Sequence, residues 1–283
     1  MAEKVALVLG GGGTVGAVEV GFIDRLEELG VKVDFIVGTS VGALNAAHVA
    51  FHDGTEHSCL SEIWHDLRHE RVFRRRPWQA LWQLWRTRTG LFENRLVGQL
   101  LLDHLDVDDF ANSRIPLHVT ATNICSGERV IFSEGSIVDA VRASTAIPGL
   151  FAPVEIKGEH YVDGGVSAGV DVKAAVELGA TTIIAIDLRS AIIDTCPTNI
   201  MDVLTRSVEI ISHARSHCNL EHADYDAKII HIQPGLKTEG RWDFKDVDRL
   251  LRDSYSMACE VFDQCWDGKR FEAGHYHLSS DKG

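Results

Sequence analysis

The first fifty residues alternate short apolar segments with helical patterns, and this alternation constrains the fold most strongly. Residues 5–9 form an apolar run that ends in glycine, and residues 14–29 carry apolar side chains at helical spacing. A second apolar run, 34–37, precedes an alanine-rich helical stretch at 41–50. This order is typical of a βαβ unit, so we expect a three-layer α/β fold: a mostly parallel central sheet with helices on both faces.

The rest of the chain continues the same mixture of patterns. We expect strands at 117–123, 129–132, 154–156, 160–162, 181–188 and 228–232, and helices at 137–143, 172–178, 200–223 and 247–265. Residues 59–105 should be mostly helical, and the tail from Gly268 should be loosely ordered. No linker rich in proline or serine divides the chain, so residues 191–283 should belong to the same domain as the core at 4–190.

Charge and composition argue against several classes of protein. A net charge of -13 disfavours general binding to nucleic acid, which needs a basic surface. No apolar stretch reaches the roughly 18 residues of a membrane span, and the N-terminal apolar run is too short for a signal peptide. The cysteines lack a Cys-x-x-Cys pair, which is typical of reduced thiols. We therefore expect a cytoplasmic protein, while the sequence predicts no particular oligomeric state.

A glycine-rich loop, Gly10 to Gly16, joins the first expected strand to the first expected helix. Unshielded N–H groups at a helix N-terminus suit an anion. Gly11, Gly13 and Gly16 match the dinucleotide-binding pattern G-x-G-x-x-G, but that fold also needs an acidic residue at the end of the second strand. Asp34 stands at the start of that strand instead, so we expect no nicotinamide cofactor. The remaining interpretations are an oxyanion hole for acyl transfer and a tight turn that needs glycine only for its backbone angles.

Ser40 lies at the centre of a short motif, Gly38 to Gly42, which reads G-T-S-V-G between the second strand and the second helix. A sharp strand-to-helix turn pushes a serine hydroxyl out of the backbone, and the flanking glycines, Gly38 and Gly42, let a substrate approach. Ser40 is therefore a candidate nucleophile. An unactivated serine is a poor nucleophile and needs a base.

Asp163 is a better candidate for this base than any of the fourteen histidines. None of the histidines lies in a glycine-rich loop after a strand, where a triad histidine is expected. Asp163 follows an apolar strand and precedes Gly164 and Gly165, which leave its carboxylate open on a tight turn. An ordinary Asp-Gly turn is the alternative interpretation. A free aspartate has a pKa of about 3.9, so it is a weak base unless burial raises that value.

Taken together, the glycine loop, the Ser40 turn and the Asp163 turn resemble the patatin-like phospholipases in their order and spacing. Two further stretches are similar to segments of that family: residues 143–153, which precede its aspartate, and residues 121–132, its central hairpin. The resemblance covers about residues 4 to 190.

The resemblance implies a Ser–Asp dyad without histidine, in which Ser40 is the nucleophile and Asp163 the base. It also implies that Gly11, Gly12 and Gly13 supply the oxyanion hole. The reaction would be hydrolysis of a phospholipid or lysophospholipid acyl ester through an acyl-enzyme, with no metal and no cofactor. A soluble carboxylesterase, thioesterase or acyltransferase on the same dyad is one alternative.

Two positions depart from the family pattern. The family usually carries Arg or Lys where this chain has Val15, so a positive charge near the loop is missing. This difference motivates a second alternative, a weakly active lipid-binding or regulatory protein. After its aspartate the family often carries Asn and Pro, whereas residues 167–170 here read Ser-Ala-Gly-Val.

A segment rich in arginine and tryptophan, at 74–86, is unusual in this acidic chain. It contains three tryptophans that share one helical face, and three arginines before them: Trp78, Trp82, Trp85, Arg74, Arg75 and Arg76. Trp and Arg together suit a lipid interface, because the indole is half apolar and arginine pairs with phosphate. Three interpretations stay open: an amphipathic helix packed on the core, a membrane-facing helix that makes the protein peripheral at the membrane, and a dimer contact.

Overall fold

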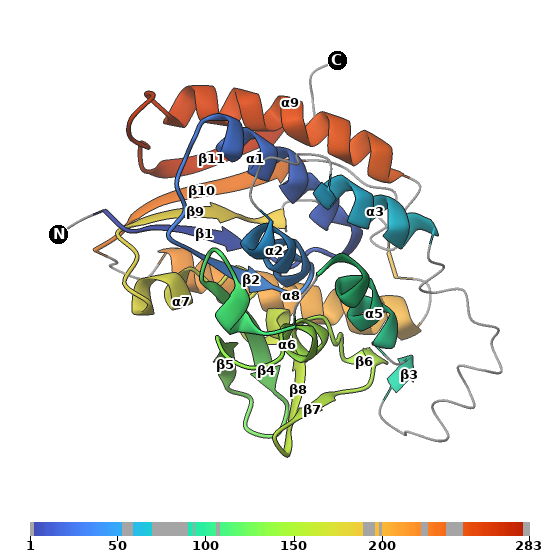
Figure 1. Ribbon diagram of the computed structural model, residues 1–283. Coiled ribbons are helices and arrows are strands. Elements are labelled where there is room, and N and C mark those ends of the chain that lie inside the picture. Colours follow the sequence, from blue (N-terminus) through green and yellow to red (C-terminus); the bar gives the residue numbers. More distant parts are fainter. Residues whose placement is uncertain are drawn as a thin grey trace.

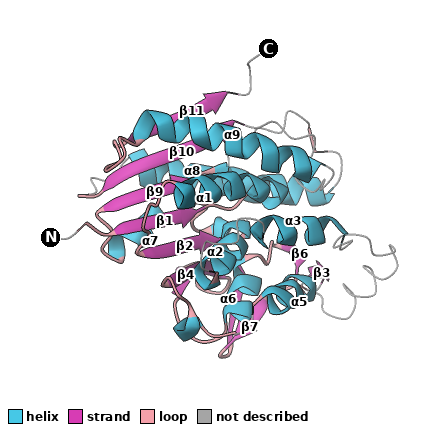
Figure 2. Cartoon of the chain, turned by 45° about the horizontal axis from the view of Figure 1, so that its top comes forward, coloured by secondary structure: helices cyan, strands magenta, loops and turns pink. Residues whose placement is uncertain are grey.

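The computed structural model describes residues 3–52, 59–69, 90–92, 94–105, 108–188, 196–197, 200–221, 226–235 and 246–279. Its centre is a mixed sheet in the strand order β11-β10-β9-β1-β2-β4-β8-β7, with β5 paired to β4. The parallel strands are β1 (Val5–Leu9), β2 (Phe35–Thr39), β4 (Leu117–Asn123), β9 (Thr182–Ile186), β10 (Lys228–Gly235) and β11 (Gly274–Ser279). Figure 2 shows these strands side by side.

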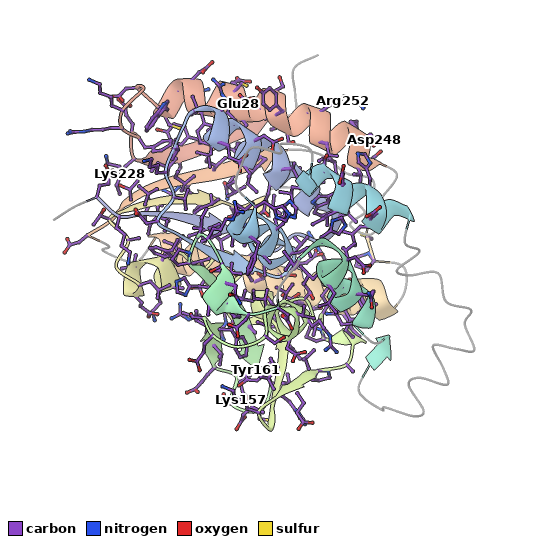
Figure 3. All side chains as sticks on the ribbon, in the orientation of Figure 1. Glu28, Lys157, Tyr161, Lys228, Asp248 and Arg252 are labelled. Atoms are coloured by element: carbon purple, nitrogen blue, oxygen red, sulfur yellow. The ribbon has the colours of Figure 1, made fainter. Side chains whose placement is uncertain are left out.

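One edge of the sheet is antiparallel. It contains β5 (Arg129–Phe132), β7 (Val154–Ile156) and β8 (Glu159–Asp163). The β7–β8 hairpin turns at Lys157 and Gly158, which both have positive φ, and Figure 3 shows Lys157 and Tyr161 at this end of the molecule. A separate small parallel sheet pairs β3 (Gly90–Phe92) with β6 (Gly149–Phe151).

The described helices lie between the strands in chain order. They are α1 (Ala17–Glu28), α2 (Val41–Phe51), α3 (Cys59–His69), α5 (Arg95–His104), α6 (Ile137–Ser144), α7 (Val172–Glu177), α8 (Ile200–Glu221) and α9 (Val247–Cys265). Short 3-10 turns occur at Gly13–Gly16, Phe110–Asn112 and Gly164–Val166. Across the described ranges, no helix combines the length and the apolar character needed to span a bilayer.

Helices cover both faces of the sheet (Figure 1), and the alternation of side chains along each strand explains why. In β1, Leu7 and Leu9 pack in the core beneath α1, α2 and α9, whereas Ala6 and Val8 pack toward α7 on the other face. A strand buried on both faces is apolar throughout, which matches the uninterrupted apolar run of β1. Helix α8 lies on the same face as α7.

Contact between α1 and α9 depends on a glycine. A side chain at Gly21 in α1 would collide with the backbone at Tyr255 in α9. The absence of a side chain there lets the two helices approach, and Phe22 then meets Phe262 edge to face at 6.0 Å between ring centroids. This packing ties the N-terminal βαβ unit to the C-terminal helix.

The expected α/β fold with a mostly parallel sheet and helices on both faces is confirmed. The expectation of a loosely ordered tail is wrong for Gly274–Ser279, which forms β11 parallel to β10. This strand is held by pairing with a distant segment, a contact that local sequence patterns do not report. Residues 74–86, with their tryptophans and arginines, lie outside the described residues.

Candidate active site

Ser40 occupies the turn between β2 and α2. Its backbone angles, φ 55° and ψ -125°, place it in a region that residues other than glycine rarely adopt. The tight turn explains both flanking glycines. A Cβ on Gly38 would lie 2.5 Å from Cα of Ala43, and a Cβ on Gly42 would lie 2.5 Å from the carbonyl oxygen of Leu9.

Ser144 holds the strained turn in place. The backbone N–H of Ser40 donates a hydrogen bond to Oγ of Ser144 at 2.8 Å, and that hydroxyl donates to the carbonyl oxygen of Thr120 at 2.6 Å. All three groups are buried, so this bridge fixes the Ser40 turn to the end of α6 and to β4. Sequence reasoning did not identify Ser144 as a site residue, although it lies in the stretch 143–153 that resembles the family.

Asp163 ends β8 and reaches the Ser40 hydroxyl. Oγ of Ser40 donates to Oδ2 of Asp163 at 2.6 Å. Strand pairing produces this proximity, because β4 lies between β2 and β8, with Thr39 paired to Thr120 and Asp163 paired to Ala121. Two chain segments 123 residues apart therefore meet at one level of the sheet.

The turn after Asp163 orients its carboxylate. The backbone N–H of Gly165 donates to Oδ1 of Asp163 at 2.7 Å, which leaves Oδ2 for Ser40. A side chain at Gly164 would collide with the Thr120 carbonyl, so the turn requires glycine there. Burial raises the pKa of Asp163 to about 6, and the hydrogen bonds from Ser40 and Gly165 oppose that rise only in part.

The glycine loop lines the same cleft as Ser40 and Asp163, through Gly11, Gly12 and Gly13. The N–H of Gly11 donates to the Gly169 carbonyl at 3.0 Å, so this amide is already bonded. For the N–H groups of Gly12 and Gly13, the described part of the chain provides no hydrogen-bond acceptor. A Cβ on Gly11 would lie 3.2 Å from Cβ of Ser40, so glycine here keeps the loop close to the serine.

A buried glutamate, Glu19, stabilises the glycine loop through hydrogen bonds. Glu19 is fully buried and accepts hydrogen bonds from the Gly10 N–H at 2.9 Å and from Nδ2 of Asn45 at 2.8 Å. Desolvation raises its pKa well above the ordinary value. Nδ2 of Asn45 also donates to the Gly16 carbonyl at 3.0 Å, so the Glu19–Asn45 pair joins both ends of the loop. Sequence reasoning missed this pair, because a glutamate within a helical pattern is usually exposed.

Two further glycine-loop residues pack inward. Val15 is buried in the main core, so a side chain at this position lies beneath the loop rather than in the cleft. A Cβ on Gly16 would collide with the Val41 side chain at 2.6 Å, which explains the glycine there. Val15 is therefore part of the core under the loop, and it is not among the described residues that line the cleft.

Helix α8 forms the opposite wall of the cleft. Thr205, Val208, Glu209 and Ser212 line it from one face of this helix, together with Ile147. Glu209 pairs with Arg206 at 3.2 Å. The sequence predicted a helix at 200–223 but did not place it at the site.

Histidine is not among the described residues that line the cleft. A His–Asp pair does occur elsewhere, where Nε2 of His231 lies 3.1 Å from Oδ2 of Asp187 and Nδ1 of His231 lies 3.0 Å from Nδ1 of His275. Within the described ranges, His, Cys, Asp and Glu side chains form no cluster of three or more that could hold a metal ion. Among the described residues, the group that accepts the hydrogen bond of the Ser40 hydroxyl is the Asp163 carboxylate.

A serine on a strained strand-to-helix turn, next to a buried carboxylate and a glycine loop, is an arrangement typical of α/β hydrolases. The sequence profile of the patatin-like phospholipases matches residues 7–176. The chain belongs to this family, as the sequence motifs predicted.

The chain is similar to several curated relatives over most of its length. It is 28% identical to lysophospholipase nte1 of Aspergillus terreus over 93% of the chain, and 31% identical to lysophospholipase NTE1 of Scheffersomyces stipitis over 92%. It spans only 18% of the length of each of these fungal proteins. An uncharacterised NTE family protein of Mycobacterium bovis is 31% identical to this chain. The matched segment covers 66% of this chain and 50% of the mycobacterial protein.

Solved structures give a weaker likeness. The crystal structure of VipD from Legionella pneumophila aligns with 93% of this chain and 67% of its own, with a TM-score of 0.48 and 16% sequence identity.

Proposed function

We propose that this protein is a lipid acyl hydrolase of phospholipase or lysophospholipase type that uses Ser40 and Asp163 as a catalytic dyad. The observation that carries the proposal is the 2.6 Å hydrogen bond from the Ser40 hydroxyl to a buried carboxylate. Membership of the patatin-like phospholipase family supports lipid esters as the substrate class. The fungal relatives, which are named lysophospholipases, support the same class.

In the first half of the reaction, Asp163 accepts the proton of the Ser40 hydroxyl as Oγ attacks the ester carbonyl carbon. Negative charge then develops on the carbonyl oxygen, and the N–H groups of Gly12 and Gly13 are the donors available to stabilise it. Gly11 is not such a donor, because its N–H is hydrogen-bonded to the Gly169 carbonyl. Its lack of a side chain instead lets the loop lie close to Ser40. Asp163 returns the proton to the departing alcohol, which leaves an acyl group on Ser40.

In the second half, water replaces the alcohol. Asp163 accepts a proton from the water, which attacks the acyl-enzyme, and the proton then goes back to Oγ of Ser40 as the fatty acid leaves. A carboxylate with a pKa of about 6 suits this role, because it is ionised at neutral pH and yet more basic than an exposed aspartate. The Ser144 hydroxyl keeps the Ser40 turn fixed through both steps.

The experiment that tests this function is labelling with a fluorophosphonate, followed by assay on a lysophospholipid and on a short soluble ester. Wild type should be labelled and should hydrolyse the lysophospholipid, whereas Ser40→Ala should do neither. Ser126→Ala removes an exposed hydroxyl outside the cleft and should behave like wild type.

Three outcomes would redirect the proposal. Preference for the short ester would favour a soluble carboxylesterase, and acyl transfer to an added alcohol would favour an acyltransferase. Lipid binding that survives Ser40→Ala, in a wild type that shows no labelling and no hydrolysis, would favour a lipid-binding or regulatory protein.

A further inference from the structure

Among the residues that the structure describes, exposed large apolar side chains are concentrated on helix α8. Val203, Leu204, Ile210 and Ile211 are 51%, 43%, 58% and 49% exposed. The remaining exposed large apolar residues of the described chain, Leu102, Ile124 and Tyr255, lie on other elements. Scattered exposed apolar residues are normal on a protein surface, whereas several on one helix face are typical of a surface that contacts a partner or a membrane.

The four side chains form one stripe along the helix. Val203 and Ile210 are seven residues apart, as are Leu204 and Ile211, so each pair is separated by two helical turns. We call these four residues the outer stripe of α8. The opposite side of the helix carries Thr205, Val208 and Ser212, which line the cleft that contains Ser40. A single helix therefore has the candidate active site on one side and an exposed apolar surface on the other.

We propose that the outer stripe of α8 docks on the surface of a lipid bilayer and so holds the cleft at the membrane. The proposal rests on the proposed function, because a phospholipid or lysophospholipid substrate resides in such a surface. A helix is roughly 10 to 12 Å across with its side chains, so docking along α8 brings the cleft to within about one helix diameter of the lipid.

Charge favours a zwitterionic lipid surface. The chain has a net charge of -13, which opposes binding to anionic lipid. On α8 itself, Arg206 is paired with Glu209, and the other arginine of the helix, Arg215, is exposed one turn beyond the stripe. Binding should therefore depend on apolar insertion and change little with salt concentration.

Flotation with phosphatidylcholine vesicles tests the proposal. The test variant is Ile210→Gln/Ile211→Gln, since glutamine keeps a high helix propensity while it removes apolar surface at two exposed positions. The matched control is Leu102→Gln/Ile124→Gln, which alters two residues of similar exposure, 50% and 46%, away from α8. We expect the test variant to lose at least about tenfold in vesicle partitioning, and the control to stay within about twofold of wild type.

Enzyme assays and size measurements complete the test. Both variants should hydrolyse p-nitrophenyl butyrate like wild type, while the test variant should lose activity on lysophosphatidylcholine presented in vesicles. Vesicle binding by wild type that is lost in the test variant supports docking, whether or not hydrolysis is seen. A lack of hydrolysis by wild type would count against the proposed function and leave the docking result in place. Equal binding by test variant and wild type, or no binding by wild type, overturns the inference. A wild-type dimer that the test variant converts to monomers also overturns it, because a second copy would then cover the stripe.

Discussion

At the scale of single residues, Asp163 shows how burial turns an ordinary side chain into a candidate base. Its pKa is raised from 3.8 to about 6 by desolvation, although Ser40 and Gly165 both donate hydrogen bonds to it. The proposed mechanism needs the ionised form. Activity should therefore fall about tenfold for each pH unit below about 6 and reach a plateau above it.

The substitution Asp163→Asn should separate activity from stability. Burial raises the pKa of Asp163, so the folded state binds a proton more tightly than the unfolded state, and wild-type stability decreases as pH rises from about 4 to about 6. An asparagine side chain cannot ionise. At pH 8 the variant should be inactive yet more stable than wild type by between about 1 and 3 kcal/mol, as measured by urea denaturation. The gap should close below pH 4, and a variant that is less stable at pH 8 would contradict this account.

The sequence predicted the pair that meets at the site but missed the groups around it. Ser40 and Asp163 lie in short glycine-bounded motifs, so local patterns pointed to them. Ser144 and Glu19 have no such motif. Their positions are set by strand order and helix packing, which bring Ser144 to the Ser40 amide and Glu19 to the Gly10 amide.

At the scale of elements, the contact between α1 and α9 rests on the missing side chain of Gly21. Valine at this position would collide with the α9 backbone and push the two helices apart. We expect Gly21→Val to lower the free energy of unfolding by about 1 to 3 kcal/mol, the range typical of overpacked cores. Chemical denaturation measures this change, and Ala17→Val, another enlargement at a buried position of α1, serves as a comparison. Equal losses in the two variants would show that the α1–α9 contact is not special.

Helices and hairpins with strong local patterns were predicted well. The expected helix at 247–265 coincides with α9, and the expected hairpin strands at 117–123 and 129–132 coincide with β4 and β5. β11 was missed, because the edge strand Gly274–Ser279 mixes histidine, tyrosine and leucine and gains its order from β10. The role of α8 as a cleft wall was also missed, since a helix pattern does not reveal what its faces contact.

At the scale of the whole molecule, the C-terminal third contributes strands β10 and β11 to the sheet that carries the candidate site. β9 lies between β1 and β10, and α9 packs on α1. We propose that residues 191–283 and the core at 4–190 fold as one unit. A chain truncated after residue 190 should then show no cooperative thermal unfolding by circular dichroism. A truncated chain that unfolds cooperatively would establish the core as an independent domain.

At Ser40, the backbone conformation that favours stability conflicts with the side chain that the proposed reaction needs. Its positive φ is unfavourable for serine and comfortable for glycine, so glycine is the residue that would relax this turn. Such a change would also remove the hydroxyl that faces Asp163. Selection for robustness alone would therefore erase the nucleophile, and a serine that persists at this turn in a lineage records continued demand for its hydroxyl.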